Sequence, residues 1–240
     1  MSKKDEEMIN FYTLPKVKKL KKNVKNPNYD LHKMDAIFRL ICIGSSGSGK
    51  TNFIFNLIHK FSNTFNHIYV FTQESETLYD YLQNVLCDDL LTIRYNLDDL
   101  HNCNGDFNDY FYGTSLCIFD DQVVKSKNEQ KVIQELFIRA RKVQNGVSLC
   151  YLSQSYYGIP KIIRLQTNYC VIIKISSNRD LKMILSEYSL NCSKEQLQKM
   201  YNYSCNTAFG NIFMIDLQSP QEKGMTYRRN FLEFLQPSNF

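Results

Sequence analysis

The stretch that decides the fold is Gly44-Ser45-Ser46-Gly47-Ser48-Gly49-Lys50-Thr51. It matches the pattern GxxxxGK[ST], and it stands between an apolar run at residues 38–43 and a pattern of helical periodicity at residues 52–61. The order of strand, loop and helix is the context that identifies a phosphate-binding P-loop. The glycines let the backbone turn with its N–H groups inward, so that these amides and the helix N-terminus can hold phosphates.

All eight residues of this loop, from Gly44 through Ser45, Ser46, Gly47, Ser48 and Gly49 to Lys50 and Thr51, are therefore expected to bind a nucleoside triphosphate. We expect the ammonium group of Lys50 to reach the β- and γ-phosphates. The hydroxyl group of Thr51 is expected to coordinate Mg²⁺. The loop alone predicts binding of a triphosphate with magnesium.

A second apolar run, at residues 115–119, ends in Asp120 and Asp121. A strand that delivers a carboxylate to the magnesium ion is the second part of a P-loop site, and Asp120 fits that role. Asp121 stands where a carboxylate could polarise the attacking water, although Asp is also common in turns at strand ends. Gln154 follows another predicted strand, at residues 147–152, and could orient water or sense the γ-phosphate; it could equally be an ordinary loop residue.

The rest of the chain alternates between short apolar runs and helical patterns. Further strands are predicted at residues 67–72, 92–95, 169–175 and 211–217, and further helices at 76–86, 129–141, 181–188 and 193–201. Ser193 and Gln196 form a capping-box signature for the last of these helices. The pattern predicts an α/β fold with a mostly parallel sheet sandwiched by helices, whose ligands lie at the carboxyl ends of the strands.

The formal net charge of +5 is concentrated at the N-terminus. Residues 1–25 contain eight lysines and three acidic residues, so the remaining residues are formally neutral. We predict a basic, irregular arm at residues 1–33 and one domain at residues 34–240 with a short C-terminal tail. Such an arm suits a polyanionic partner, because lysines neutralise phosphates whatever their sequence; the alternative is a solvated tail.

Several classes of protein are not favoured by the composition. No apolar run is long enough to span a membrane, and the N-terminus lacks the apolar segment of a secretory signal. The eight cysteines contain no CxxC pair, and four of them lie inside strand-like runs, where free cysteine behaves as a buried apolar residue. The four histidines show no metal-binding spacing.

Three arginines are candidates for stabilising the transition state of a neighbouring subunit. Arg139 and Arg141 lie on or just beyond the helix that follows Asp121, and Arg164 follows Pro160. An arginine that reaches a γ-phosphate from another subunit can raise the rate of hydrolysis by a factor of about 10³–10⁵. Their spacing does not distinguish this role from that of solvated side chains.

Three segments together resemble a known family. They are the P-loop, Ile-Phe-Asp-Asp at 118–121, and Arg-Lys-Val-Gln-Asn-Gly-Val-Ser-Leu-Cys-Tyr-Leu-Ser-Gln-Ser-Tyr-Tyr-Gly-Ile-Pro-Lys-Ile-Ile-Arg at 141–164. They are similar to the poxvirus-type genome-packaging ATPases of large DNA viruses and virophages, within the FtsK–HerA superfamily. The resemblance covers residues 37–217, and the third segment is more specific than the other two.

The resemblance implies a RecA-like ATPase core that forms a ring, a hexamer, and drives double-stranded DNA into a viral capsid at a portal-like vertex. It implies action in the host cytoplasm at the virus assembly site, or on the virion. Carried over by position, Lys50 and Thr51 bind ATP and Mg²⁺, Asp120 is the metal-side acid and Gln154 is the polar sensor. Asp121 takes a position where cellular members of the superfamily usually have Glu, and its shorter side chain puts its catalytic reach in question.

Two other classes of function share these motifs. A nucleoside kinase-like phosphotransferase would use the same loop, but the sequence shows no clear lid motif. A nucleotide-gated DNA-binding protein or capsid adaptor would bind ATP and hydrolyse it negligibly, which the shorter Asp121 side chain would allow. DNA-stimulated release of phosphate distinguishes the motor from both.

Overall fold

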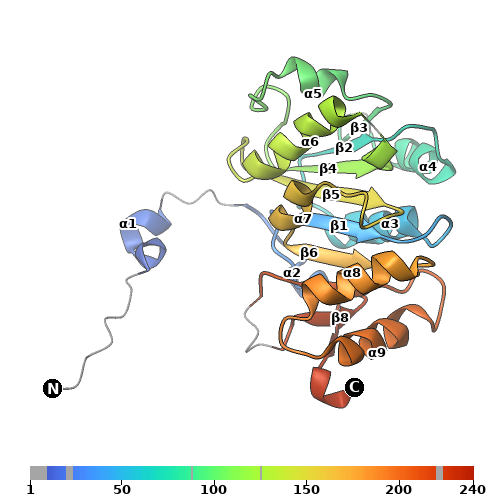
Figure 1. Ribbon diagram of the computed structural model, residues 1–240. Coiled ribbons are helices and arrows are strands. Elements are labelled where there is room, and N and C mark those ends of the chain that lie inside the picture. The colour runs from blue at the N-terminus through green and yellow to red at the C-terminus, as the bar shows by residue number, and fades with distance from the viewer. Residues whose placement is uncertain (1–9, 20–23, 88, 125, 220–223) are drawn as a thin grey trace.

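The computed structural model describes residues 10–19, 24–87, 89–124, 126–219 and 224–240. At its centre, these residues form a nine-stranded sheet with the strand order β3-β2-β4-β5-β1-β6-β7-β8-β9 (Figure 1). The strands are β1 (Arg39–Ile43), β2 (His67–Phe71), β3 (Leu91–Arg94), β4 (Ser115–Asp120), β5 (Val147–Ser153), β6 (Tyr169–Ile172), β7 (Phe213–Asp216), β8 (Tyr227–Arg229) and β9 (Glu233–Leu235).

The strands from β3 to β6 are all parallel, and β7, β8 and β9 continue the sheet in antiparallel pairs. The predicted, mostly parallel sheet is confirmed. Strand β5 lies between β1, which enters the P-loop, and β4, which ends at Asp120. Because the carboxyl ends of these three strands meet at one edge, the segments that follow them share one site.

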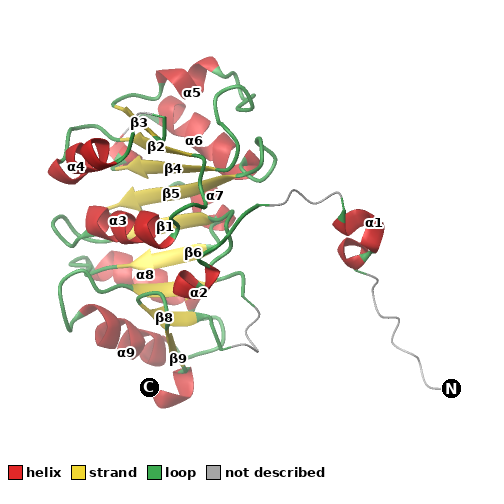
Figure 2. Ribbon diagram, turned by 180° about the vertical axis from the view of Figure 1, so that it is seen from behind, coloured by secondary structure: helices red, strands yellow, loops and turns green. Residues whose placement is uncertain are grey.

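Helices cover both faces of the sheet, as the apolar pattern predicts. They are α2 (Tyr29–His32), α3 (Lys50–Lys60), α4 (Thr77–Val85), α5 (Asp98–Asn102), α6 (Lys127–Arg139), α7 (Lys161–Gln166), α8 (Asn178–Tyr188) and α9 (Lys194–Cys205). Helices α5 to α9 pack on one face, and α3 and α4 pack on the other (Figures 1 and 2). Alternate residues of β1 enter the two cores, Ile41 the first and Leu40 the second, so the strand is apolar on both sides.

Local signals fix the beginnings of two helices. Ser193 accepts a hydrogen bond from the backbone of Gln196 (3.1 Å), and Gln196 accepts one from the backbone of Ser193 (2.9 Å). The capping box predicted for α9 is therefore present. Ser126 and Glu129 form a second one at the start of α6. Among the described residues, no helix combines the length and the apolar character needed to cross a bilayer.

The C-terminal segment differs from the predicted tail. Strands β8 and β9 form a hairpin that pairs with β7 and extends the sheet. Each has only three residues, and the middle residue of β8 is Arg228, which a local pattern assigns to the surface. In the structure the Arg228 side chain is fully buried and forms an ion pair with Asp216 of β7.

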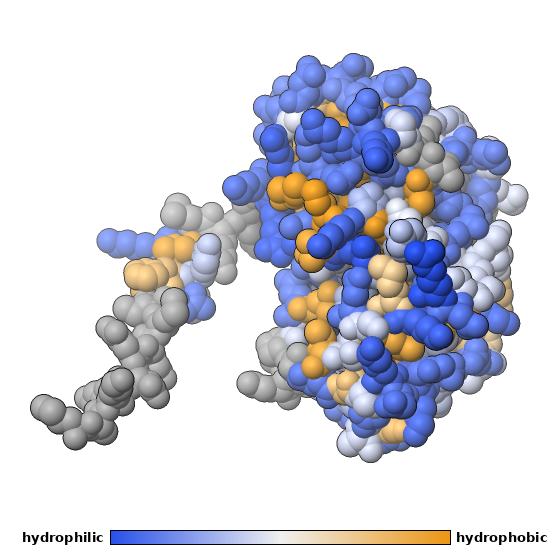
Figure 3. Space-filling view, in the orientation of Figure 1, coloured by the Kyte–Doolittle hydropathy of each residue, from blue (hydrophilic) through white to orange (hydrophobic). Residues whose placement is uncertain are grey.

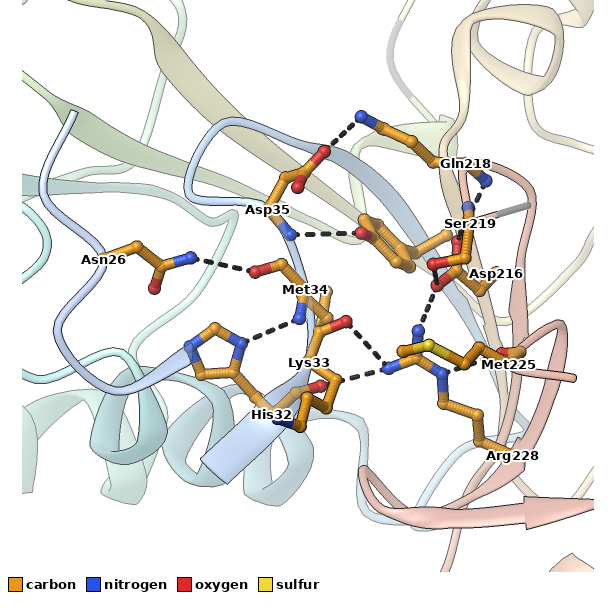
Figure 4. A network of polar contacts seen from close by, with 11 residues as sticks. Asn26, His32, Lys33, Met34, Asp35, Asp216, Gln218, Ser219, Met225 and Arg228 are labelled. Carbon is orange, nitrogen blue, oxygen red and sulfur yellow. Dashed lines mark hydrogen bonds and ion pairs between the residues drawn. The ribbon is translucent and has the colours of Figure 1, made fainter. Parts of the chain in front are cut away.

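The N-terminal segment also differs in part from the predicted irregular arm. Helix α2 packs on the domain, and the buried Arg228 donates hydrogen bonds to the carbonyl oxygens of His32 and Lys33, both at 3.1 Å (Figure 4). Residues 10–19 contain a 3-10 turn (Phe11–Thr13) and α1 (Pro15–Lys18). Residues 1–9 and 20–23 of the predicted arm, with several of its lysines, lie outside the described residues.

Candidate functional site

The P-loop connects β1 to α3 and wraps around the side chain of Lys50. Two of its glycines have positive φ angles, 68° at Gly47 and 100° at Gly49, which residues with a Cβ rarely adopt. A Cβ atom on Gly44 would lie 2.4 Å from Oγ of Ser48, so any larger residue here would force the Ser48 side chain to move. The Nζ atom of Lys50 donates to the carbonyl oxygen of Gly44 at 3.1 Å, and the residue is almost completely buried.

Ser45 fixes the loop to the segment that follows β6. Its backbone N–H donates to the carbonyl oxygen of Lys174 (3.0 Å), and its Oγ accepts from the backbone N–H of Ser176 (2.8 Å). The loop is therefore held from both sides of β1, because Gly44 also donates to the carbonyl oxygen of Ser153 in β5 (3.2 Å). These contacts fix the conformation of the loop without any ligand.

Asp120 is the last residue of β4 and lies beneath this loop. Only 6% of its surface is exposed, and it accepts a hydrogen bond from the hydroxyl group of Tyr79 at 2.7 Å. Burial raises the pKa of the Asp120 carboxyl from 3.8 to about 6, and the nearby acids Asp121 and Glu76 act in the same direction. Tyr79 and Lys50 oppose the rise in this pKa without cancelling it.

The hydroxyl group of Thr51 lies near the carboxyl groups of Glu76, Asp120 and Asp121. Thr51 Oγ1 donates to Oε2 of Glu76 at 2.8 Å, beside Asp120 and Asp121. Oxygen ligands are those that Mg²⁺ prefers, and the raised pKa of Asp120 marks negative charge that a cation would relieve. In the described part of the chain, no three Asp, Glu, His or Cys side chains converge to hold a metal. These residues therefore fit a magnesium ion that takes its other ligands from phosphates and water.

Asp121 and Gln154 directly follow the neighbouring strands β4 and β5, and their side chains are in contact. Gln154 Nε2 donates to Oδ2 of Asp121 at 3.1 Å, so the predicted catalytic carboxylate and the predicted sensor are in contact. Asp121 has a φ angle of 49°, a conformation that Asp tolerates better than most residues. Gln73 Nε2 holds its backbone by donating to the Asp121 carbonyl oxygen at 2.5 Å.

These groups line one open cleft at the carboxyl edge of the sheet. The part next to the P-loop has a volume of about 480 Å³ and is lined by Ser46, Gly47, Gly49, Lys50, Thr51, Asn52, Glu76, Leu78, Asp120, Asp121, Gln154 and Phe209. A neighbouring part of about 590 Å³ shares Glu76, Asp120, Asp121 and Gln154 with it. The cleft is large enough for a nucleoside triphosphate.

The three candidate arginines lie elsewhere in the subunit. Helix α6 runs back from the carboxyl edge, and the carbonyl oxygen of Ala140 accepts from Val147, the first residue of β5. Arg139 and Arg141 are therefore at the amino-terminal edge of the sheet, opposite the P-loop. Arg164 is ion-paired with Glu187 and lies over the ring of Tyr156 at 5.0 Å.

Comparison with known proteins places the chain in a family. A sequence model described as the poxvirus A32 protein matches residues 28–216. The chain belongs to the poxvirus A32 protein family. This confirms the resemblance to the poxvirus-type packaging ATPases, and the matched region includes the P-loop, Asp120, Asp121 and Gln154. No curated protein sequence matches the chain.

Solved structures share the fold of this family member at low sequence identity. The genome packaging NTPase B204 of Sulfolobus turreted icosahedral virus 2, solved with AMPPCP, has a TM-score of 0.58 at 18% identity over 82% of this chain and 98% of that chain. The same NTPase with ATP-gammaS has a TM-score of 0.54 at 17% identity, over 84% of this chain and 100% of that chain. EssC from Geobacillus thermodenitrificans has a TM-score of 0.54 at 13% identity, over 83% of this chain and 40% of that chain. The predicted RecA-like P-loop fold is confirmed.

Sequence reasoning missed several residues that line the cleft or contact its lining. Glu76 and Gln73 follow the predicted strand at 67–72, so the rule that ligands bind at the carboxyl ends of parallel strands could have identified them. Tyr79 was assigned only to a helix, and its contact with Asp120 depends on how α4 packs on the sheet. Phe209 lies in a loop far along the chain, and no sequence signal connects it with the P-loop.

Proposed function

We propose that this protein is an ATP-hydrolysing motor that moves double-stranded DNA into a viral capsid. The observation that supports the proposal is that one cleft is lined by Lys50, Thr51, Asp120 and the Asp121–Gln154 pair. The chain that contains this cleft belongs to the poxvirus A32 family. The B204 NTPases, which are described as genome packaging enzymes, share its fold. The motor would act in the infected cell, where virions assemble.

The residues of the cleft have separate roles in this proposal. Lys50 exchanges its present carbonyl partners for the β- and γ-phosphate oxygens, and the loop amides hold the remaining phosphate charge. Thr51 and Asp120 would hold Mg²⁺, which would supply positive charge beside the phosphates. Asp121 accepts a hydrogen bond from the attacking water. Gln154 fixes the Asp121 carboxylate and so orients that water, which offsets part of the shorter reach of Asp compared with Glu.

Assembly into a ring, a hexamer, is the finer part of the proposal, because the candidate arginines cannot serve their own subunit from where they lie. Arg139 is next to the exposed Ile138 on α6, and Arg164 is next to the exposed Leu165 on α7. Figure 3 shows apolar side chains gathered on this face, in the region of α6 and α7. We propose that a neighbouring subunit covers this surface and receives one of the arginines at its γ-phosphate.

The experiment that tests the motor is phosphate release with and without double-stranded DNA, over a series of salt concentrations. We expect DNA to stimulate turnover, and Lys50→Ala to abolish it with or without DNA. Removal of residues 1–25 should make DNA binding less sensitive to salt, because the logarithmic slope falls by about 0.9 for every phosphate that the arm neutralises. Exposed Lys194, at the start of α9, lies outside the arm, the cleft and the surface of α6 and α7, so Lys194→Ala serves as the control.

Other outcomes would identify the alternatives. If DNA changes neither turnover nor binding at low salt, the translocation proposal is wrong. Phosphate transfer to an added nucleoside, rather than to water, would indicate a kinase. Tight ATP binding with negligible multiple-turnover release would indicate a nucleotide-gated adaptor.

A further inference from the structure

One end of the cleft is formed by an aromatic side chain that the chemistry above does not use. Phe209 is 76% exposed, although a large apolar side chain usually gains by burial. Its ring lies against the P-loop: a Cβ atom on Gly49 would be 3.3 Å from Cζ of Phe209. The ring lines the same cleft as Lys50, Thr51 and Asn52.

Residues of the C-terminal hairpin form hydrogen bonds with the loop that carries Phe209. It connects α9 to β7, and Nη2 of Arg229 in β8 donates to Oγ1 of Thr207 at 2.9 Å. The backbone N–H of Ile212 donates to Oδ1 of Asn230 at 3.1 Å, which fixes the other end of the loop. The loop that carries the exposed ring is therefore fixed on both sides of Phe209.

Phe209 lies at the end of the cleft opposite the residues that would face the γ-phosphate. Asp121 and Gln154, which would face the γ-phosphate, come from β4 and β5, whereas Phe209 contacts Gly49 at the start of α3. Asn52, on the first turn of α3, is also at this end, because a Cβ atom on Gly210 would be 3.1 Å from its Nδ2. A nucleotide whose phosphates lie on Lys50 would thus extend its nucleoside towards an aromatic face and an amide.

We propose that Phe209 is the platform on which the base of the bound nucleoside triphosphate stacks, with the Asn52 amide beside the base. The inference rests on the proposed function, in that it assigns the base end of the same site. Stacking of a base on an aromatic side chain changes affinity by roughly 5- to 100-fold. A purine gains more than a pyrimidine, because its two rings overlap a larger part of the phenyl face.

The test separates the base from the phosphates by using two probes. Binding of ATP and of inorganic tripolyphosphate, each with magnesium, is measured by calorimetry for the wild type and for Phe209→Ala. We expect the substitution to weaken ATP binding about tenfold and to leave tripolyphosphate binding within about twofold. CTP should be affected less than ATP. Tyr112, 70% exposed and just before the amino end of β4, provides the matched control Tyr112→Ala, which should change neither.

A second variant gives a direct signal, because the chain contains no tryptophan. In Phe209→Trp the new indole is the only one, and ATP should quench its fluorescence while tripolyphosphate should not. The proposal is overturned if Phe209→Ala leaves ATP binding unchanged, or if it weakens both probes equally, since the ring would then act only through the P-loop. If the wild type itself binds neither probe, the proposed function fails, and this result differs from either of those.

Discussion

Two strand ends of the sheet bury an aspartate, and they differ in how far its negative charge is balanced. Asp216, at the end of β7, is paired with the buried Arg228 and also accepts from the backbone N–H groups of Gln218 and Ser219, both at 2.9 Å. Asp120, at the end of β4, has a tyrosine hydroxyl as its hydrogen-bond donor and two acids nearby. The first carboxylate is satisfied within the protein, whereas the second has a pKa raised to about 6.

The difference distinguishes the antiparallel strands, where charge stabilises the fold, from the parallel strands, whose ends form the candidate site. In the antiparallel part, Arg228 joins β7 and β8 to the carbonyl oxygens of His32 and Lys33, so charge holds distant segments together (Figure 4). In the parallel part, the charge of Asp120 is incompletely balanced at an open cleft. Buried charge that lacks a protein partner is costly, and it is typical of sites that bind a ligand of opposite charge.

The largest effect is expected from Asp120→Asn. The amide can still accept the Tyr79 hydrogen bond but cannot hold Mg²⁺ well, so ATP turnover should fall by a factor of at least about 10³, equivalent to ~4 kcal/mol in the barrier. Because the substitution removes a desolvated charge, the melting temperature without nucleotide should stay the same or rise. Phosphate release measures the turnover, and thermal unfolding measures the melting temperature. A clear loss of stability would show that Asp120 has a structural role like that of Asp216.

Arg228→Met tests the other side of the comparison. It leaves Asp216 buried without a cation and removes two donors from the N-terminal segment, so the free energy of unfolding should fall by roughly 3 kcal/mol. Denaturant unfolding measures this loss. The double variant R228M/D216N should lose less than the sum of the two single variants, because each single change leaves a buried partner unpaired. Additive losses would contradict the role assigned to the ion pair.

The parallel and antiparallel parts of the sheet also differ in how well the sequence predicts them. The parallel strands and their helices are local patterns: continuous apolar runs, helical periodicity and the capping box at Ser193. The residues that follow those strands, from Lys50 to Asp121, could be assigned because strand ends in a parallel sheet share one edge. In contrast, β8 was not predicted, because the burial of Arg228 depends on Asp216 and His32, which are distant in sequence. Phe209 was missed for the same reason, since its contact with Gly49 exists only in the folded chain.

The smallest effect is expected for the pH dependence of stability, through His32 in the segment that Arg228 contacts. His32 is fully buried and stacks on Phe61 with ring centroids 3.8 Å apart, and its Nδ1 accepts from the backbone N–H of Met34. Burial, together with the nearby cations Lys60, Arg228 and Lys33, lowers the pKa of His32 from 6.5 to about 4. The stability that this neutral imidazole contributes is therefore complete above pH 6.5 and is lost as the pH falls towards 4.

At pH 5 the His32 side chain of the unfolded protein is mostly protonated, whereas that of the folded protein is not. This difference should lower the free energy of unfolding by about 2 kcal/mol relative to pH 7. His32→Asn keeps an acceptor for the Met34 N–H but does not titrate, so this part of the pH dependence should disappear in denaturant unfolding at the two pH values. His101 is exposed, and His101→Asn should leave the pH dependence as it is in the wild type. An unchanged pH dependence in His32→Asn would mean that folding does not change the pKa of His32, so that the segment held by Arg228 does not keep this imidazole neutral.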